Sequence, residues 1–330
     1  MKISLLFGLA AGAALTVALH APLATTVLGL IAFGVLHNVL ELRYVAGRFA
    51  PVLRGRFLVV LLGLISAIVV CRLAAMFVGE PARYAEILVG YAVLAAGCAH
   101  ALRGRRLGAA AVVLTVAAAM SLGFPGYHFV ILAHLHNVVP LFFLWEWGGR
   151  LRRAAVFRWT QVAWVLGVPA LILAGALDFA LGGIAPSTVA AFAGDPARII
   201  AASAPPGSTT ITGARFLVVF AFLQTMHYFV WVYFLPRHAP DAARAFEARL
   251  GVLRGWRAWA LGGGLGAAFA VLFVIDYASG RALYGAFASY HAYLEFPVLL
   301  ALLSASGTAG SQLVFRETAS ERQDPAAVST

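Results

Sequence analysis

Two histidine–glutamate pairs lie within strongly apolar segments of this chain. In "HNVLE" His37 precedes Glu41 by four residues, and in "HAYLE" His291 precedes Glu295 by the same interval. Residues four apart share one face of an α-helix, so each pair presents an imidazole beside a carboxylate. Such a pair can ligate a metal ion jointly, or the carboxylate can orient the histidine that ligates it. Two such pairs predict a metal site.

The segment "AHLHN" adds His134 and His136, which differ by about 200° around a helix. A straight helix cannot aim both at one centre. The tetrapeptide Leu-His-Asn-Val, present at 36–39 and 135–138, favours His136. The spacing of six from a histidine to a following proline, which His134 shares with His291, favours His134. The sequence leaves both residues as candidate ligands, and Pro140 is expected to bend this helix.

A fifth candidate, His227, has Gln224 one turn earlier and Tyr228 beside it. An amide at that position can hold the tautomer of the histidine or contact a substrate oxygen. The predicted metal ligands are therefore His37, His134 or His136, His227 and His291. The predicted catalytic or supporting residues are Glu41, Glu295 and Tyr228.

These residues must be positioned by membrane-spanning helices. Of 330 residues 62% are hydrophobic and 11% charged, and the mean hydropathy of +0.90 indicates a polytopic membrane protein. The net charge of +11 comes from basic clusters between apolar runs, which is typical of topology signals and not of nucleic-acid binding. Cys71 and Cys98 lie inside apolar runs, so neither a disulfide framework nor a thiolate metal site is expected.

The predicted fold is an all-α transmembrane bundle of about ten spans, the first of them a retained helix and not a cleaved signal peptide. The predicted spans are 3–19, 22–42, 57–78, 85–102, 107–123, 127–147, 159–181, 214–235, 258–276 and 284–304. With both termini cytoplasmic, nineteen Lys and Arg residues lie inside and four outside, as the positive-inside rule requires. A multi-pass protein of the bacterial inner membrane is expected.

Residues 1–315 are predicted to form one domain. Its long outside loop, 182–213, is expected to be an irregular cap. The cytoplasmic stretch 238–257 is predicted to be an amphipathic surface helix, and 316–330 a polar, disordered tail.

Ionisable side chains within spans are costly, which makes the histidines functional candidates. The first hypothesis is a non-haem metal enzyme, most simply iron, that uses dioxygen on a lipophilic substrate drawn from the membrane lipid, with an electron donor where the reaction needs one. The second is a b-type cytochrome with histidine axial ligands to haem b. The third is a proton-coupled transporter that uses His and Glu as relay groups.

Depth along the predicted spans bears on the number of metals. His291 and His134 lie about seven residues from the outer ends, whereas His227 and His37 lie about thirteen and fifteen residues in. At about 1.5 Å per residue this predicts two levels roughly 10 Å apart, which suits two metals or two haems. The two glutamates weigh against a bis-histidine haem, which does not need them.

The order of four motifs, "LHNVLE", "AHLHN", "TMHYF" and "YHAYLE", resembles the spaced intramembrane histidine motifs of the Brp/Blh family of membrane β-carotene 15,15'-dioxygenases. Members of that family cleave β-carotene to retinal with dioxygen and are thought to use histidine-bound iron. The resemblance implies an oxygen-using iron enzyme with a carotenoid or related substrate. It also implies that His37, one of His134 and His136, His227 and His291 are the iron ligands.

Overall fold

The computed structural model of the chain describes residues 2–182 and 188–306. Every regular element in this part of the chain is helical. The predicted polar tail, 316–330, lies outside the described residues, and so do 183–187 of the predicted outside loop.

Within the described ranges, nine helical segments are long and apolar enough to cross a membrane. They are α1 (Lys2–His20), α2 (Pro22–Arg48), α3 (Gly55–Val78), α4 (Glu80–Ala101), α5 (Gly104–Gly123), α6 with α7 (Pro125–Gly148), α8 to α9 (Ala154–Leu173), α12 to α13 (Thr210–His238) and α15 (Trp256–Ile275). The last helix, α16 (Tyr277–Ser306), has 30 residues and contains the tenth predicted span. The all-helical, multi-pass architecture is confirmed, whereas the number of ten spans and the orientation of the termini stay predictions.

Three of these segments are irregular. Pro140 separates α6 (Pro125–Val138) from α7 (Pro140–Gly148), at the predicted bend. A π-helical turn, η1 (Ala163–Gly167), joins α8 (Ala154–Val162) to α9 (Val168–Leu173). A second π-helical turn, η3 (Phe229–Phe234), joins α12 (Thr210–Tyr228) to α13 (Leu235–His238). Such turns often accompany functional sites, and η3 begins two residues after His227.

The boundaries predicted for span 159–181 were wrong at both ends. The helical segment begins at Ala154 and ends at Leu173. Gly175 ends it, because its φ of +80° lies in the left-handed region that glycine adopts without steric cost. A short 3₁₀ turn, η2 (Asp178–Ala180), follows.

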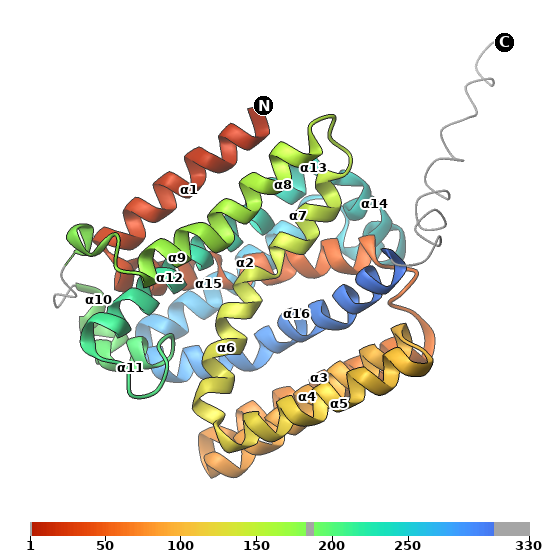
Figure 1. Cartoon of the computed structure of the whole chain (residues 1–330), viewed down its shortest axis with the longest axis horizontal. Helices are drawn as coiled ribbons and strands as arrows, with labels where there is room; N and C mark the ends of the chain where they lie inside the picture. The colour runs from red at the N-terminus through yellow and green to blue at the C-terminus, as the bar shows by residue number, and fades with distance from the viewer. Residues whose placement is uncertain (1, 183–187, 307–330) are drawn as a thin grey trace.

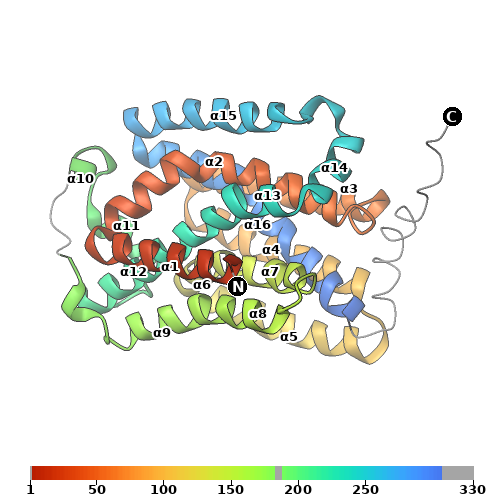
Figure 2. The same ribbon diagram turned by 90° about the horizontal axis from the view of Figure 1, so that it is seen from above.

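Four helices, α2, α6, α12 and α16, form the centre of the bundle (Figures 1 and 2). α2 packs against α12 and α16, and α12 also packs against α6. α15 covers α2, the hairpin of α3 and α4 lies against α16, α5 lies against α4, and α1 lies against α12. α5 has no buried residue, and its exposed Val112, Val116 and Met120 form a surface suited to lipid.

The two ends of the bundle differ. At one end lie two short helices, α10 (Thr188–Ala193) and α11 (Pro196–Ala201), so the predicted irregular loop is partly helical. We call this the cap end; it is the outside in the predicted topology. At the opposite end α14 (Pro240–Arg249) and the 3₁₀ turn η4 (Gly251–Leu253) occupy the predicted surface helix.

The contact between α14 and α2 depends on a glycine. A Cβ atom on Gly47 would lie 2.0 Å from the carbonyl oxygen of Ala242, well inside van der Waals contact. Ala242 and Phe246 are the buried residues of α14. The backbone of α14 therefore lies directly against α2 at Gly47, although the other face of α14 is polar.

Candidate metal centre

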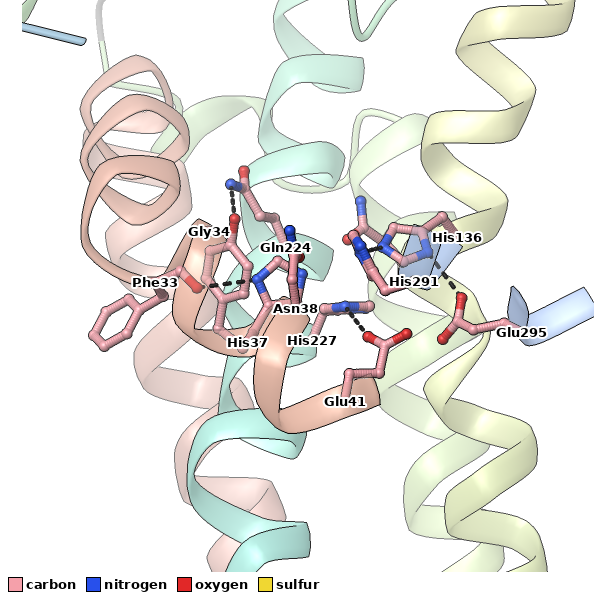
Figure 3. Close-up of polar contacts among 12 residues, drawn as sticks. Phe33, Gly34, His37, Asn38, Glu41, His136, Gln224, His227, His291 and Glu295 are labelled. Carbon is pink, nitrogen blue, oxygen red and sulfur yellow. Dashed lines mark hydrogen bonds and ion pairs between the residues drawn. The ribbon is translucent and has the colours of Figure 1, made fainter. Parts of the chain in front are cut away.

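Four histidines from four helices meet inside the bundle (Figure 3). His37 lies on α2, His136 on α6, His227 on α12 and His291 on α16. One ring nitrogen from each lies within 4.8 Å of the others. A group of imidazole nitrogens at this spacing can surround a single metal ion.

Hydrogen bonds fix the orientation of two of the rings. The Nδ1 of His37 lies 3.0 Å from the carbonyl oxygen of Phe33, one turn earlier on α2. The Nδ1 of His136 lies 2.9 Å from Oε2 of Glu295 on α16. Because these acceptors occupy the Nδ1 side, the Nε2 atoms are left unprotonated for a metal.

The other two rings complete the group. The Nε2 of His291 lies 3.1 Å from the Nε2 of His136, so these two atoms face the same point. His227 is 1% exposed, and neither of its ring nitrogens has a hydrogen-bond partner among the described residues. Its ring lies 4.6 Å, centroid to centroid, from that of His136. A buried imidazole without a partner is costly, and a bound metal would remove that cost.

The two predicted glutamates lie together on one side of the histidines. Glu41 and Glu295 are each 0% exposed. Oε2 of Glu41 lies 3.5 Å from Nε2 of His227, and Glu295 accepts from His136 as described. Each glutamate follows its histidine by one turn, and α2 and α16 both begin at the cap end, so the carboxylates lie on the side away from the cap. Neither oxygen of Glu41 has a hydrogen-bond partner in the described ranges.

A cavity of about 220 Å³ lies on the other side of the histidines. The lining residues that precede the four histidines on their helices include Leu30, Ala133, Gln224 and Tyr284. The cavity therefore extends from the centre towards the cap end. The histidine group therefore faces the cavity on its cap side, and Glu41 and Glu295 cover its opposite side.

Tyr228 lies in this cavity, as its predicted role requires. Its ring is 4.6 Å from that of His37, and its hydroxyl accepts a hydrogen bond of 2.7 Å from Nε2 of Gln224. The Gln224 amide therefore does not hold the tautomer of His227, as one of its two predicted roles required, because it bonds to the Tyr228 hydroxyl and the Thr26 carbonyl oxygen instead. Tyr293 also lines the cavity, whereas Trp231 is buried beside His227 outside it.

His134 is not part of the group. Its Nε2 lies 2.7 Å from the carbonyl oxygen of Ser203, and its ring packs between Phe216 and Phe220. The structure brings His136 to the centre, because the 200° between the two residues turns His134 to another side of α6. The repeated tetrapeptide, and not the spacing to proline, identified the residue that joins the group.

The expected two levels of histidine were wrong. All four lie at one level, since their nitrogens are within 4.8 Å of one another. The error came from helix boundaries: α16 begins at Tyr277 and not at 284, which places His291 deeper than expected. The inference of two metals or two haems loses its basis.

A partly buried ion pair beside the cavity was missed from the sequence. Arg72 on α3 donates from Nε to Oε1 of Glu86 on α4 at 2.7 Å, and from Nη1 to the carbonyl oxygen of Gly285 at 2.6 Å. The hydroxyl of Tyr293 lies 3.5 Å from the same Glu86 oxygen. A signal was present, because Arg72 and Glu86 lie seven residues before and after Gly79 at the turn of one helical hairpin. Equal distances from a turn place two residues at the same depth.

No protein-family model, curated protein or solved structure matches this chain.

Proposed function

We propose that this protein is an integral-membrane oxygenase in which a non-haem metal ion, iron(II), is bound by His37, His136, His227 and His291. The observation that carries the proposal is the meeting of four nearly buried histidines, one from each central helix, with their nitrogens within 4.8 Å. An isolated histidine within a span commonly serves as a hydrogen-bond partner for a neighbouring helix. Four histidines at one point can form few hydrogen bonds with one another, so this structural role does not explain the group.

The charges around the site support a divalent ion. Four neutral imidazoles supply nitrogen ligands and no charge, and Glu41 and Glu295 stand directly behind them. Two buried carboxylates without a cation would be expensive in a bundle interior. With a dication they compensate its charge and orient the histidines.

The chain's own residues then have distinct tasks. His37 and His136 present Nε2 because Phe33 and Glu295 hold their Nδ1 atoms. Glu41 supports His227 from the closed side. The bound metal would supply activation of dioxygen at positions that the histidines leave open. Tyr228 and Gln224 line the open face, where they orient a substrate against the centre.

The same geometry favours a non-haem ion over haem b. A porphyrin occupies four positions of its iron and leaves two for axial protein ligands. The four histidines are more than the two axial ligands that a haem iron can take. They also lie too close together for a porphyrin ring to fit between them. A relay transporter would use histidines spaced along a path, whereas these converge on one point.

The substrate proposed is a lipophilic small molecule, such as a carotenoid, an isoprenoid or a lipid. The enclosing helices are apolar, and the cavity is lined by Leu30, Phe129 and Leu132 as well as by the polar groups named above. Cleavage of a double bond by dioxygen places one oxygen atom on each carbon and needs no further reductant. A hydroxylation would need two electrons from a donor. The inner membrane of a bacterium is the proposed location.

Dioxygen uptake by the purified, iron(II)-loaded protein in the presence of a total membrane lipid extract tests the reaction class. Uptake should exceed that of the His291→Ala variant at least tenfold. Equal uptake by the two proteins would contradict the proposal. Co-expression in carotenoid-producing bacteria tests the substrate: carotenoid cleavage should bleach the cells and yield an aldehyde, and unchanged pigment with confirmed expression removes carotenoids from the candidates.

A further inference from the structure

A second and larger cavity, of about 920 Å³, lies at the cap end of the bundle. We call it the vestibule. Its walls come from the ends of α3, α4 and α6, from α11, and from the junction of α15 with α16, as its lining residues Ala75, Arg83, Gly126, Arg198 and Asp276 show. All of these helix ends belong to the predicted outer side.

The vestibule adjoins the cavity of the metal centre. Arg72, Phe129 and Gly285 line both cavities. Arg72 is held at this junction by its bonds to Glu86 and to the Gly285 carbonyl oxygen. The two cavities therefore meet at the wall that these three residues form.

The charged groups of the vestibule leave two cations unpaired. Its lining contains four arginines and three acidic residues: Arg72, Arg83, Arg198, Arg281, Glu86, Asp195 and Asp276. Arg72 pairs with Glu86, and Arg83 pairs with Glu80 just outside the lining.

The remaining two acids, Asp195 and Asp276, accept hydrogen bonds from backbone N–H groups. Asp195 accepts from the N–H of Ala197 at 2.9 Å, and Asp276 accepts from the N–H of Ser279 at 3.0 Å. Both cap helix starts. Among residues 2–182 and 188–306, neither Arg198 nor Arg281 has an ion-pair partner, so the vestibule offers two guanidinium groups to a ligand.

The inner cavity has room for only part of a large substrate. At about 30 Å³ for a group the size of water or a methylene, 220 Å³ holds roughly seven such groups. A whole carotenoid does not fit in that space. The remainder of any long substrate must occupy the vestibule or leave the bundle.

From these observations we propose that the substrate is a single-chain amphiphile with an anionic head group, a carboxylate or a phosphate. Arg198 and Arg281 bind its head in the vestibule, and its apolar tail passes Arg72 and Phe129 to lie beside the four histidines. The assignment of the tail rests on the proposed function, whereas the head-group site rests on the vestibule alone. The centre would then act near the tail end of such a molecule.

Binding of three probes with the same ten-carbon chain tests this inference: decanoate, decyl phosphate and decan-1-ol. The full-length protein is held in nanodiscs of neutral lipid, and empty nanodiscs give the blank. At least one anion should bind tenfold or more tightly than the alcohol, and the tighter anion identifies the head group. Equal affinity of all three probes would overturn the proposal.

Variants locate the two parts of the ligand. Arg198→Gln with Arg281→Gln should reduce the preference for anions to less than threefold, whereas Arg257→Gln, an exposed arginine of α15 at the other end of the bundle, should leave it unchanged. Ala133→Leu, which fills the inner cavity, should weaken all three probes at least threefold. A preference that survives the double variant overturns the head-group site, and unchanged affinity in Ala133→Leu overturns the position of the tail.

Metal content measured on the same samples separates this proposal from the previous one. Protein without bound iron that still prefers anions through Arg198 and Arg281 would refute the metal centre and leave the head-group site standing. Protein with bound iron but without a preference for anions would refute the head-group site and leave the metal centre standing.

Discussion

Two histidines on one helix, two residues apart, have opposite relations to the centre. His136 points Nε2 at His291, while His134 bonds to the Ser203 carbonyl oxygen on the far side of α6. They have the same chemistry and almost the same depth. They therefore provide a matched pair for testing which side chains hold a metal.

His136→Ala should abolish stoichiometric metal binding, because it removes a ligand and leaves Glu295 buried without its partner. His134→Ala should keep the metal content within about 20% of the unchanged protein, and its cost should be limited to about 1–3 kcal/mol of stability from the lost hydrogen bond. Metal analysis of both purified variants checks this. Equal loss in both would show that the effect is on folding, not on ligation.

Glu295→Ala should lower metal affinity by about tenfold to a hundredfold, since carboxylates that orient ligating histidines typically have effects of that size. The measurement is a competitive titration with a chelator. Glu80→Ala is the control, because Glu80 is exposed and, among the residues that the structure describes, its one ion pair is with Arg83. An affinity unchanged by Glu295→Ala would mean that Glu295 does not support His136.

Much of this site was predictable at the level of residues. Helical periodicity alone predicted that His37, Glu41, His291 and Glu295 share one site, and they do. The predicted partners were wrong, because Glu41 contacts His227 and Glu295 contacts His136, each on another helix. The choice between His134 and His136 was not predictable, because it depends on the rotation of α6 against α12 and α16. Arg72 with Glu86 was accessible in principle through their equal distance from Gly79.

At the scale of elements, close approach between helices is set by small residues at a few positions. Gly47 lets α14 lie against the end of α2, and this contact closes the end of the bundle opposite the cap. The sequence predicted a surface helix here but not this contact, since nothing in its pattern names the partner of a particular glycine.

Gly47→Ala should destabilise the protein by about 1–3 kcal/mol, because the added methyl group would lie 2.0 Å from the Ala242 oxygen and force α14 away. Thermal unfolding in detergent measures the change. Gly63→Ala on the exposed face of α3 is the control; with nothing within 4 Å of its Cβ, it should be neutral or stabilising. A Gly47→Ala protein as stable as this control would contradict the close approach.

The same end of the bundle carries a pH-dependent contact. Glu247 on α14 accepts from the Gly255 N–H at 2.9 Å and pairs with Arg43 of α2. The Gly255 hydrogen bond, followed by Arg43, lowers the pKa of Glu247 below its ordinary value of 4.5. Stability from this group is therefore present above pH 4.5 and is lost as the pH falls through the lowered pKa.

Glu247→Gln should accordingly cost about 0.5–1 kcal/mol at pH 7, and the difference from the unchanged protein should shrink below pH 4.5. Unfolding curves at several pH values check it. A difference that grows towards acid pH would have the wrong sign for a carboxylate stabilised in its charged form.

For the whole molecule, the side of the membrane from which a ligand enters the vestibule depends on which end of the bundle faces the outside. Most helix boundaries followed from hydropathy and arginine clusters. The larger errors were at span 159–181, where Gly175 stops a helix inside an apolar run, and at span 284–304, where α16 already begins at Tyr277. Orientation rests on the arginine asymmetry alone.

Single cysteines in a background with Cys71→Ala and Cys98→Ala test the orientation. Ala201→Cys at the cap end should react with a membrane-impermeant maleimide added to intact spheroplasts, and Val252→Cys at the opposite end should react only after lysis. The reverse pattern would invert the topology and place the vestibule in the cytoplasm.

Metal analysis and an absorption spectrum of the same detergent-purified protein test whether the four histidines hold a mononuclear non-haem metal ion. We expect about one iron per chain, no Soret band, and loss of that iron in His227→Ala. A Soret band, or iron content unchanged in His227→Ala, would contradict such a metal centre.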